Sequence, residues 1–276
     1  MGIESWGCAH GLASSMNGPG RMMSRFCLKR IDVLVLAGGL GTRLRAVLGD
    51  TPKLLAPIGD RPYLAYLIDW LSHFGARRLL LGLGHRADAV RAYLDHMPAT
   101  AVTIESVVEP RPLGTAGAVR FARAQLASDP VLVMNGDSFV DADLCAFLGH
   151  HRKGRALGTI LCAEVENAGR YGRVTRDRTG AIAGFVEKDA SYHGTALVNA
   201  GAYLLSARLL DYIATSTAAS LEVDVFERLP QGALAAFVGG RTFIDIGTPD
   251  SLARASSILA GRCLEPNRRK LKRLPS

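Results

Sequence analysis

The sequence predicts an α/β fold with a doubly wound, mostly parallel sheet flanked by helices. Apolar runs rich in Val, Leu and Ile at 31–35, 78–83 and 131–135 are typical of strands buried on both faces. Segments of helical periodicity alternate with these runs, as in βαβ units. Glycines follow the first run directly, so the chain can turn tightly where that strand ends.

The expected elements follow the chain in order. In the first half they are strand 31–35, short helix 40–47, helix 63–74 with Gly75 as its stop, strand 78–83, helix 87–95, strand 101–108, helix 114–126 capped near Thr115, and strand 131–135. In the second half they are shorter strands at 158–163, 172–176, 181–186 and 196–205, then a helix at 250–259 with its cap region at 248–250. We expect the shorter strands to form β-rich, sugar-binding insertions over a site.

Gly38, Glu109 and Asp137 each follow the end of a predicted strand. Ligands of doubly wound sheets gather at the carboxyl ends of the strands. We therefore expect these three residues to share one site.

Cysteine usage and hydropathy limit the class of protein. The 276 residues include five cysteines, an odd number, widely spaced and without a C-x-x-C pair. This pattern indicates neither a disulfide framework nor a zinc site, and it favours a reducing cytoplasm. No apolar run reaches the roughly 18 residues of a membrane span.

The net charge of +8 is concentrated at the two ends of the chain. Four basic residues against Glu4 give residues 1–30 a charge of +3, and six against Glu265 give residues 262–276 a charge of +5, so the part between them is neutral. We expect 1–30 to be a disordered extension, 31–261 a single domain and 262–276 a basic tail. Binding of nucleic acid by the tails is disfavoured; it predicts strong salt dependence that disappears when both tails are deleted.

The turn after the first strand reads Leu36-Ala37-Gly38-Gly39-Leu40-Gly41-Thr42-Arg43. Its glycines can present bare NH groups to a phosphate chain, and Arg43 adds a permanent charge with a planar donor fork. The G-G-x-G-x-R spacing differs from both the dinucleotide fingerprint and the P-loop. Polyphosphate binding is the first hypothesis, and a glycine-rich turn without a ligand is its alternative.

A second motif follows the turn, Pro52-Lys53-Leu54-Leu55-Ala56-Pro57-Ile58, and the stretch RPYLAYLIDWL comes after it. Together with LAGGLGTRL, these motifs resemble the sugar 1-phosphate nucleotidyltransferases, which join a nucleoside triphosphate to a sugar 1-phosphate and release pyrophosphate. The resemblance covers residues 31 to 255. It implies a Rossmann-like fold of the nucleotide-diphospho-sugar transferase type.

The resemblance also implies which residues bind the nucleotide. Arg43 would steady the β and γ phosphates, and Lys53 the α-phosphate, where charge builds up during transfer. The implied nucleotide-binding residues are Leu36, Ala37, Gly38, Gly39, Gly41, Thr42, Arg43, Lys53, Glu109, Pro112, Gly114 and Thr115.

Two aspartates are candidates for holding Mg²⁺. Asp137 follows a buried strand, and Mg²⁺ commonly takes one or two carboxylates plus substrate phosphates; an Asx-type cap of the following turn is the alternative role. Asp245 lies in an apolar run, where an unpaired charge is costly. In the family, the matching aspartate shares the metal.

The sugar pocket is implied at Gly172, Glu187, Lys188 and Asn199. Glu187 would accept hydrogen bonds from sugar hydroxyls, and Lys188 would hold the phosphate that becomes the nucleophile. The implied catalytic residues are Arg43, Lys53, Asp137 and Lys188.

Glu109 opens the loop that resembles the base-reading loop of the family. A carboxylate only accepts hydrogen bonds, and guanine offers adjacent donors at N1 and N2. Glu109 therefore favours GTP. His85, near a strand end, could approach the nucleotide, but we expect it to be a turn histidine.

The sequence as a whole predicts a Mg²⁺-dependent sugar 1-phosphate guanylyltransferase. It is most similar to the D-glycero-α-D-manno-heptose 1-phosphate guanylyltransferases, whose product, a GDP-heptose, feeds bacterial surface-glycan assembly such as capsule. Mannose 1-phosphate or another hexose 1-phosphate is the alternative substrate, and a catalytically silent regulatory relative the alternative class. The expected partners are the nucleoside triphosphate and the sugar 1-phosphate, with a homo-oligomer left open.

Overall fold

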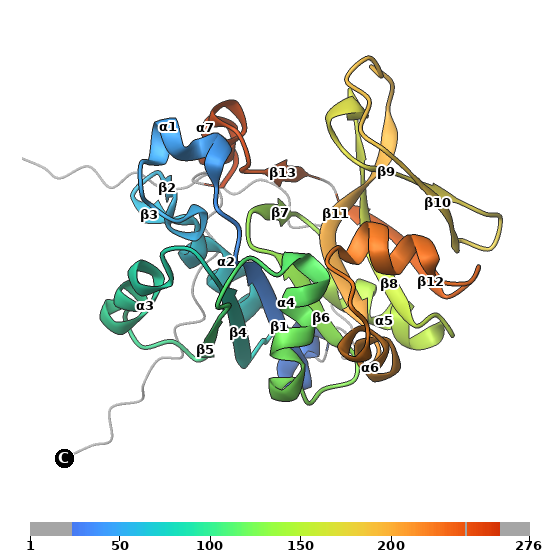
Figure 1. Ribbon diagram of the computed structural model, residues 1–276, viewed down its shortest axis with the longest axis horizontal. Helices are drawn as coiled ribbons and strands as arrows, with labels where there is room; N and C mark the ends of the chain where they lie inside the picture. The colour runs from blue at the N-terminus through green and yellow to red at the C-terminus, as the bar shows by residue number, and fades with distance from the viewer. Residues whose placement is uncertain (1–23, 241, 260–276) are drawn as a thin grey trace, which may run out of the picture.

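A nine-stranded mixed sheet forms the centre of the protein, whose computed structural model describes residues 24–240 and 242–259 (Figure 1). Seven strands form one row, and β8 (Gly158–Val165) branches from it to pair with β11 and with β12 (Leu234–Gly240). The row runs β10 (Ile182–Val186), β9 (Arg173–Arg176), β11 (Ala196–Leu205), β6 (Val131–Asn135), β1 (Asp32–Ala37), β4 (Arg78–Leu83) and β5 (Thr103–Val108).

Along the row of seven strands, the pairing changes from parallel to antiparallel at one seam, between β6 and β11. β6, β1, β4 and β5 are parallel to one another, whereas β11 is antiparallel to β6, β8 and β9. The predicted mostly parallel sheet flanked by helices is confirmed for the first half of the chain. The strands of the second half do not form separate insertions. Instead, β8, β11 and β12 extend the main sheet, and the hairpin β9–β10 forms its edge.

Helices cover both faces of the sheet. Val33 and Val35 of β1 pack in a core cluster with α2, α3 and α5, while Leu34 packs in a second cluster with α4 and α6. All three side chains are fully buried, which is why their run is apolar without interruption. The helices are α1 (Arg45–Leu48), α2 (Tyr63–His73), α3 (Ala87–His96), α4 (Gly114–Ala122), α5 (Leu144–Lys153), α6 (Ala207–Thr215) and α7 (Pro249–Leu259).

Short elements connect these layers. Two small antiparallel sheets pair β2 (Pro57–Ile58) with β3 (Arg61–Pro62) and β7 (Ser138–Val140) with β13 (Phe243–Asp245). The 3₁₀ turns are η1 (Ser24–Arg30), η2 (Thr42–Leu44), η3 (Lys53–Leu55), η4 (Arg123–Gln125), η5 (Ala168–Arg170) and η7 (Phe226–Arg228), and η6 (Leu221–Val225) is a π-helix.

Three local predictions near helix ends have different outcomes. The helix expected at 40–47 is wrong in its first turn, because Gly41 has a φ of +62° and the chain forms η2 before α1. Thr115 does not cap α4, since its hydroxyl accepts a hydrogen bond from the distant Leu221 NH at 2.8 Å. The cap region of α7 is confirmed: the Thr248 hydroxyl accepts from Ser251 NH at 3.3 Å.

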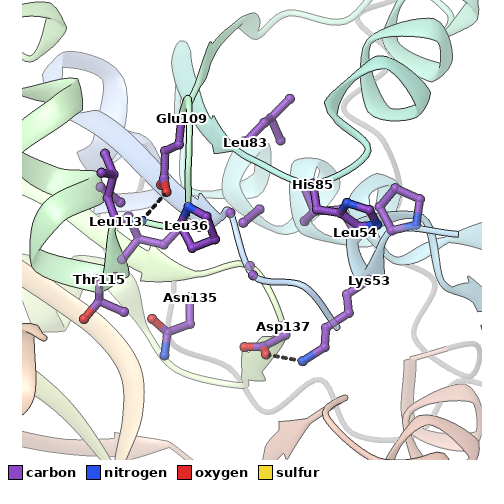
Figure 2. Close-up of a pocket in the computed structure, with 18 of the residues that line it drawn as sticks. Leu36, Lys53, Leu54, Leu83, His85, Glu109, Leu113, Thr115, Asn135 and Asp137 are labelled. Carbon is purple, nitrogen blue, oxygen red and sulfur yellow. Dashed lines mark hydrogen bonds and ion pairs between the residues drawn. The ribbon is translucent and has the colours of Figure 1, made fainter. Parts of the chain in front are cut away.

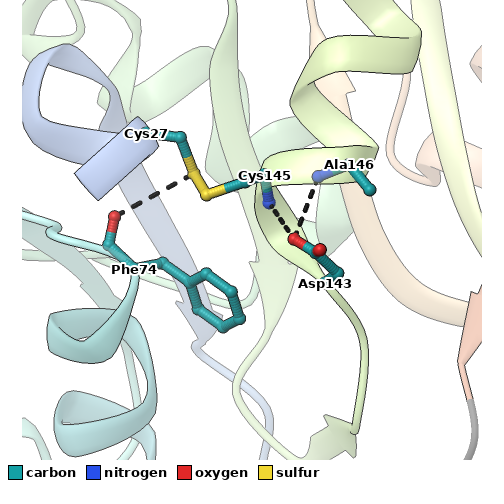
Figure 3. The surroundings of a disulfide bond; sticks show 5 residues. All are labelled: Cys27, Phe74, Asp143, Cys145 and Ala146. Atoms are coloured by element: carbon teal, nitrogen blue, oxygen red, sulfur yellow. Dashed lines mark hydrogen bonds between the residues drawn. A yellow bond between two sulfur atoms is a disulfide. The ribbon is translucent and has the colours of Figure 1, made fainter. Parts of the chain in front are cut away.

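The disordered extension expected over 1–30 is wrong for residues 24–30, because η1 belongs to the fold. Leu28 is buried, and Cys27 forms a disulfide with Cys145 at the start of α5 (Figure 3). The prediction of no disulfide is therefore wrong. The 118 residues that separate the two cysteines hide the pairing in the sequence.

The remaining terminal predictions, an extension over residues 1–23 and a basic tail over 262–276, lie outside the described residues. Within 24–240 and 242–259, the structure contains no helix with the length and apolar character needed to cross a membrane.

Candidate active site

A cavity of about 320 Å³ opens where β1, β5 and β6 end (Figure 2). The predicted meeting of Gly38, Glu109 and Asp137 is confirmed, since all three line it. The expected nucleotide-binding residues in its wall are Leu36, Ala37, Gly38, Gly39, Lys53, Glu109, Pro112, Gly114 and Thr115.

Gly38 leaves room for a carboxylate that packs directly against it. A Cβ at this position would lie 2.8 Å from Glu109 Oε1, closer than real Cβ contacts allow. At Gly39, by contrast, a Cβ would meet no protein atom within 4 Å. The first glycine is therefore needed for packing within the protein, and the second leaves space open at the cavity.

Glu109 is nearly enclosed, with 8% of its surface exposed. Its backbone NH bonds to Leu83 O at 2.8 Å, and its carboxylate accepts from Leu113 NH at 3.1 Å, which holds the side chain in the cavity wall. Burial raises the pKa of this carboxyl group. An ionised carboxylate has about four lone-pair sites, so Glu109 can still accept hydrogen bonds from a ligand with adjacent donors.

Lys53 and Asp137 form an ion pair in the same cavity. Lys53 Nζ lies 3.0 Å from Asp137 Oδ2, and Figure 2 shows the two side chains pointing toward each other. Lys53 belongs to η3, and Asp137 follows β6. The Lys53 ammonium thus lies beside the Asp137 carboxylate. These are the two groups that the sequence predicts to contact the α-phosphate and the metal.

Asp245, on β13, comes close to Asp137, although it is not among the residues that line the cavity. Antiparallel pairing of β13 with β7 sets Asp245 opposite Ser138, and Ile246 NH bonds to Asp137 O at 2.8 Å. Burial, and then the charge of Asp137, raise the pKa of Asp245. A buried carboxylate beside a second carboxylate makes a fitting donor pair for a divalent cation.

The composition of this donor set indicates how a metal would be held. The structure shows no group of three or more His, Cys, Asp or Glu suited to a metal within the described ranges. Mg²⁺ at Asp137 and Asp245 would therefore need substrate phosphate oxygens and water to complete its shell.

The expected sugar-binding residues lie on the antiparallel side of the seam. Asn199 NH bonds to Gly172 O at 3.3 Å, so these two residues are brought together. Glu187 and Lys188 follow β10, which pairs with β9, and both are exposed.

Three residues of the glycine-rich turn lie apart from the cavity wall. Gly41, Thr42 and Arg43 are not among its lining residues, and Arg43 is exposed on η2. The structure therefore does not bring Arg43 into the group formed by Lys53, Asp137 and Asp245.

The cavity also includes residues that sequence reasoning did not select. His85, expected as a turn histidine, lines it, and so does Asn135, whose buried Oδ1 has no hydrogen-bond partner within the described part of the chain. Asn135 sits two residues before Asp137 in the same motif, so its position at the strand end was the available signal. The other lining residues without a predicted role are Pro52, Leu54, Leu83, Val90, Leu113, Ala118 and Gly136.

The fold and this cavity define a class of protein. A mixed sheet carries a glycine turn and Asp137 after two of its parallel strands, and an ion-paired lysine and a second carboxylate, Asp245, lie beside Asp137. The profile of the nucleotidyl transferase family matches residues 32–261, and the chain belongs to this family.

Within this family, the chain is similar to several guanylyltransferases that act on sugar 1-phosphates. The chain is 31% identical to D-glycero-alpha-D-manno-heptose 1-phosphate guanylyltransferase of Aneurinibacillus thermoaerophilus, over 83% of this chain and 98% of the relative. It is 31% identical to mannose-1-phosphate guanylyltransferase of Mycobacterium tuberculosis, over 83% of this chain and 65% of that protein. The crystal structure of HddC from Yersinia pseudotuberculosis complexed with GMP-PN has a TM-score of 0.74 and 32% identity, over 83% of this chain and 99% of HddC.

Proposed function

We propose that this protein transfers GMP from GTP to D-glycero-α-D-manno-heptose 1-phosphate, with release of pyrophosphate and formation of GDP-heptose. The observation that carries the proposal is Glu109, a buried carboxylate in the wall of the nucleotide-sized cavity. Guanine offers two adjacent donors to such an acceptor, whereas a pyrimidine ring lacks this pair. The heptose 1-phosphate guanylyltransferase that matches almost end to end supports the same assignment.

The reaction needs positive charge more than a proton-transfer base. An oxygen of the sugar phosphate attacks the α-phosphorus, and the bond to pyrophosphate breaks, so two anions must approach each other. Lys53 lies beside Asp137 in the cavity, where it would stabilise charge on the α-phosphate. Arg43, on the exposed turn next to the cavity, would close onto the β and γ phosphates.

A divalent metal is typical of this family. Mg²⁺ held by Asp137 and Asp245 would supply a Lewis acid that neutralises the triphosphate. The charge of Asp137 and the burial of Asp245 already favour a cation between the two side chains.

On the sugar side, Lys188 would hold the phosphate of the nucleophile, and Gly172, Glu187 and Asn199 would contact the sugar. Mannose 1-phosphate is the second candidate substrate, because a mannose-1-phosphate guanylyltransferase is equally identical to this chain. The heptose is preferred, because its enzyme is covered over 98% of its length and the mannose enzyme over 65%.

Two further expectations are less direct. A silent relative would be expected to lose a phosphate-binding cation or a metal carboxylate, and this chain keeps Lys53, Lys188, Asp137 and Asp245. A cytoplasmic location stays a prediction, although the Cys27–Cys145 disulfide removes the argument drawn from cysteine usage.

The test is pyrophosphate release with Mg²⁺, for four nucleoside triphosphates against the heptose, mannose and glucose 1-phosphates. GTP with the heptose phosphate is expected to give the highest kcat/KM. Asp137→Asn should lower it by roughly 1,000-fold, since a metal ligand is lost. Asp211→Asn is the matched control, because Asp211 on α6 pairs with Arg123 outside the cavity wall.

Each alternative outcome has a separate meaning. A higher kcat/KM with mannose 1-phosphate than with the heptose 1-phosphate would replace the proposed sugar and leave GTP as the proposed nucleotide. Higher turnover of UTP or dTTP than of GTP would refute the argument from Glu109. No turnover with any pair would move the silent-relative hypothesis to the front.

A further inference from the structure

A chain of hydrogen bonds through Glu222 joins the nucleotide cavity to the sugar side of the protein. Glu222 lies in the π-helix η6, between α6 and β12. Its Oε2 accepts from the hydroxyls of Thr115 at 3.3 Å and Ser220 at 3.1 Å, and its Oε1 accepts from the Tyr203 hydroxyl at 2.8 Å. Since Thr115 lines the cavity, the carboxylate is anchored to its wall.

The Tyr203 hydroxyl connects Glu222 to Asn199 by two hydrogen bonds. The Tyr203 side chain is fully buried on β11, and burial together with the charge of Glu222 raises its pKa well above the ordinary value, so the hydroxyl keeps its proton. Because that single proton is donated to Glu222, the hydroxyl oxygen is left to accept from Asn199 Nδ2 at 3.0 Å.

The Asn199 amide is thereby fixed in one orientation. Its Nδ2 faces Tyr203, and its Oδ1 accepts from Gly201 NH at 2.9 Å. Gly201 sits in a bulge of β11 with a φ of +72°, and a Cβ there would lie 2.8 Å from Asn135 Nδ2 in the cavity wall. The second proton of Asn199 Nδ2 stays available to a ligand hydroxyl.

We propose that Glu222 is a positioning residue for the sugar 1-phosphate, acting through Tyr203 on Asn199. The inference rests on the proposed function, which places Asn199 in the sugar pocket. A carboxylate suits this role because it accepts only, and so it sets the direction of the Tyr203 proton. A neutral amide at 222 can donate as well as accept, which leaves the hydroxyl and the Asn199 amide free to reverse.

Tyr203→Phe tests the inference by removing only the central hydroxyl. The KM for the preferred sugar 1-phosphate should rise about tenfold, the factor expected for one lost hydrogen bond. The Kd of a non-hydrolysable GTP analogue, measured by calorimetry without sugar, should change less than about twofold, because Glu109 and Lys53 are untouched. Tyr66→Phe is the matched control: Tyr66 is also buried, and its hydroxyl donates to Ile58 O at 3.1 Å, outside this network.

Glu222→Gln provides a second variant that keeps the shape of the side chain if Tyr203→Phe fails to fold. It should also raise the KM for the sugar phosphate and leave the Kd of the GTP analogue unchanged. An unchanged sugar KM in a folded variant, or an equal loss of GTP binding, would overturn the inference while the wild-type activity stands. No turnover by the wild type would instead overturn the proposed function, and the inference with it.

Discussion

The two sides of the sheet present their functional residues differently. On the parallel side, β1, β4, β5 and β6 end at one edge, and the residues that follow them enclose a cavity. On the antiparallel side, β9 and β10 form an edge hairpin, and Glu187 and Lys188 at its end are exposed. Asp137 and Asp245 lie close together where β7 pairs with β13 in a separate small sheet.

Under the proposed function, this difference would separate the recognition of the two substrates. Glu109 is buried and held by Leu113 NH, so the nucleotide side can select a base by a preformed acceptor. The side proposed to bind the sugar has exposed charges, and its ordered polar group is Asn199, which hydrogen-bonds to Tyr203, itself bonded to Glu222. We therefore expect substitutions on the two sides to separate into effects on GTP and effects on the sugar phosphate.

The largest expected effect that sharpens this comparison is that of Lys188→Met. Loss of a charge-assisted contact to the nucleophilic phosphate should lower kcat/KM for the sugar 1-phosphate by about 100-fold. The Kd of a GTP analogue, measured by calorimetry, should stay the same. Arg178→Met is the control, because Arg178 is an exposed cation in the turn of the same hairpin.

The expected separation between the two sides would be contradicted if Lys188→Met weakened GTP binding as much as it lowered kcat/KM for the sugar phosphate. An equal loss in Arg178→Met would assign the effect to the net charge of the hairpin. Steady-state kinetics at two ionic strengths would separate these cases, since long-range effects of exposed charges are screened by salt.

The parallel side was also the easier one to predict from the sequence. Strands β1, β4 and β6 are mostly apolar because both of their faces are buried, and Gly75, with a φ of +83°, follows α2 where the sequence placed a stop. Strand ends of parallel neighbours share an edge, so Gly38, Glu109 and Asp137 could be placed in one site before any contact was known.

The rest depends on contacts between distant segments. The partners of Glu222 lie on α4 and β11, and the pairing of β7 with β13 joins segments about 100 residues apart in the printed sequence. The disulfide has the same character. Periodicity and local motifs depend on residues that are close along the chain. They therefore do not predict contacts between segments that are distant in the sequence.

A smaller effect, confined to the nucleotide side, is expected for Glu109→Gln. The amide can donate, so one acceptor for guanine is lost, and kcat/KM for GTP should fall by about 10- to 100-fold. Turnover of dTTP or UTP relative to GTP should rise. Glu105→Gln on β5, the strand that precedes Glu109, is the control, because Glu105 pairs with Arg78 and does not line the cavity.

The pH dependence of Glu109 gives a second measurement. Its pKa is raised by burial, so the wild-type KM for GTP should begin to rise, as pH falls, at a higher pH than for an ordinary carboxyl group, and Glu109→Gln should lack this rise. The pH dependence of folding stability has the opposite direction to that of GTP binding. Because the pKa is raised in the folded state, ionisation of Glu109 lowers the free energy of unfolding as pH increases. The ligand-free Glu109→Gln protein should therefore melt no lower than the wild type at neutral pH.

The smallest effect on activity is expected for Cys27→Ser. The Cys27–Cys145 disulfide joins η1 to α5, and none of the residues that line the cavity belongs to either element. Closing a loop of this length should stabilise the fold by roughly 2–4 kcal/mol, so the variant should unfold at a lower urea concentration while both KM values stay unchanged. A reductant should lower the stability of the wild type and leave Cys27→Ser unaffected. A changed KM would mean that η1 acts on the site through the strand it precedes, since β1 begins two residues after Arg30 and carries the glycine turn at its other end. In that case the comparison between the two sides would need a third region.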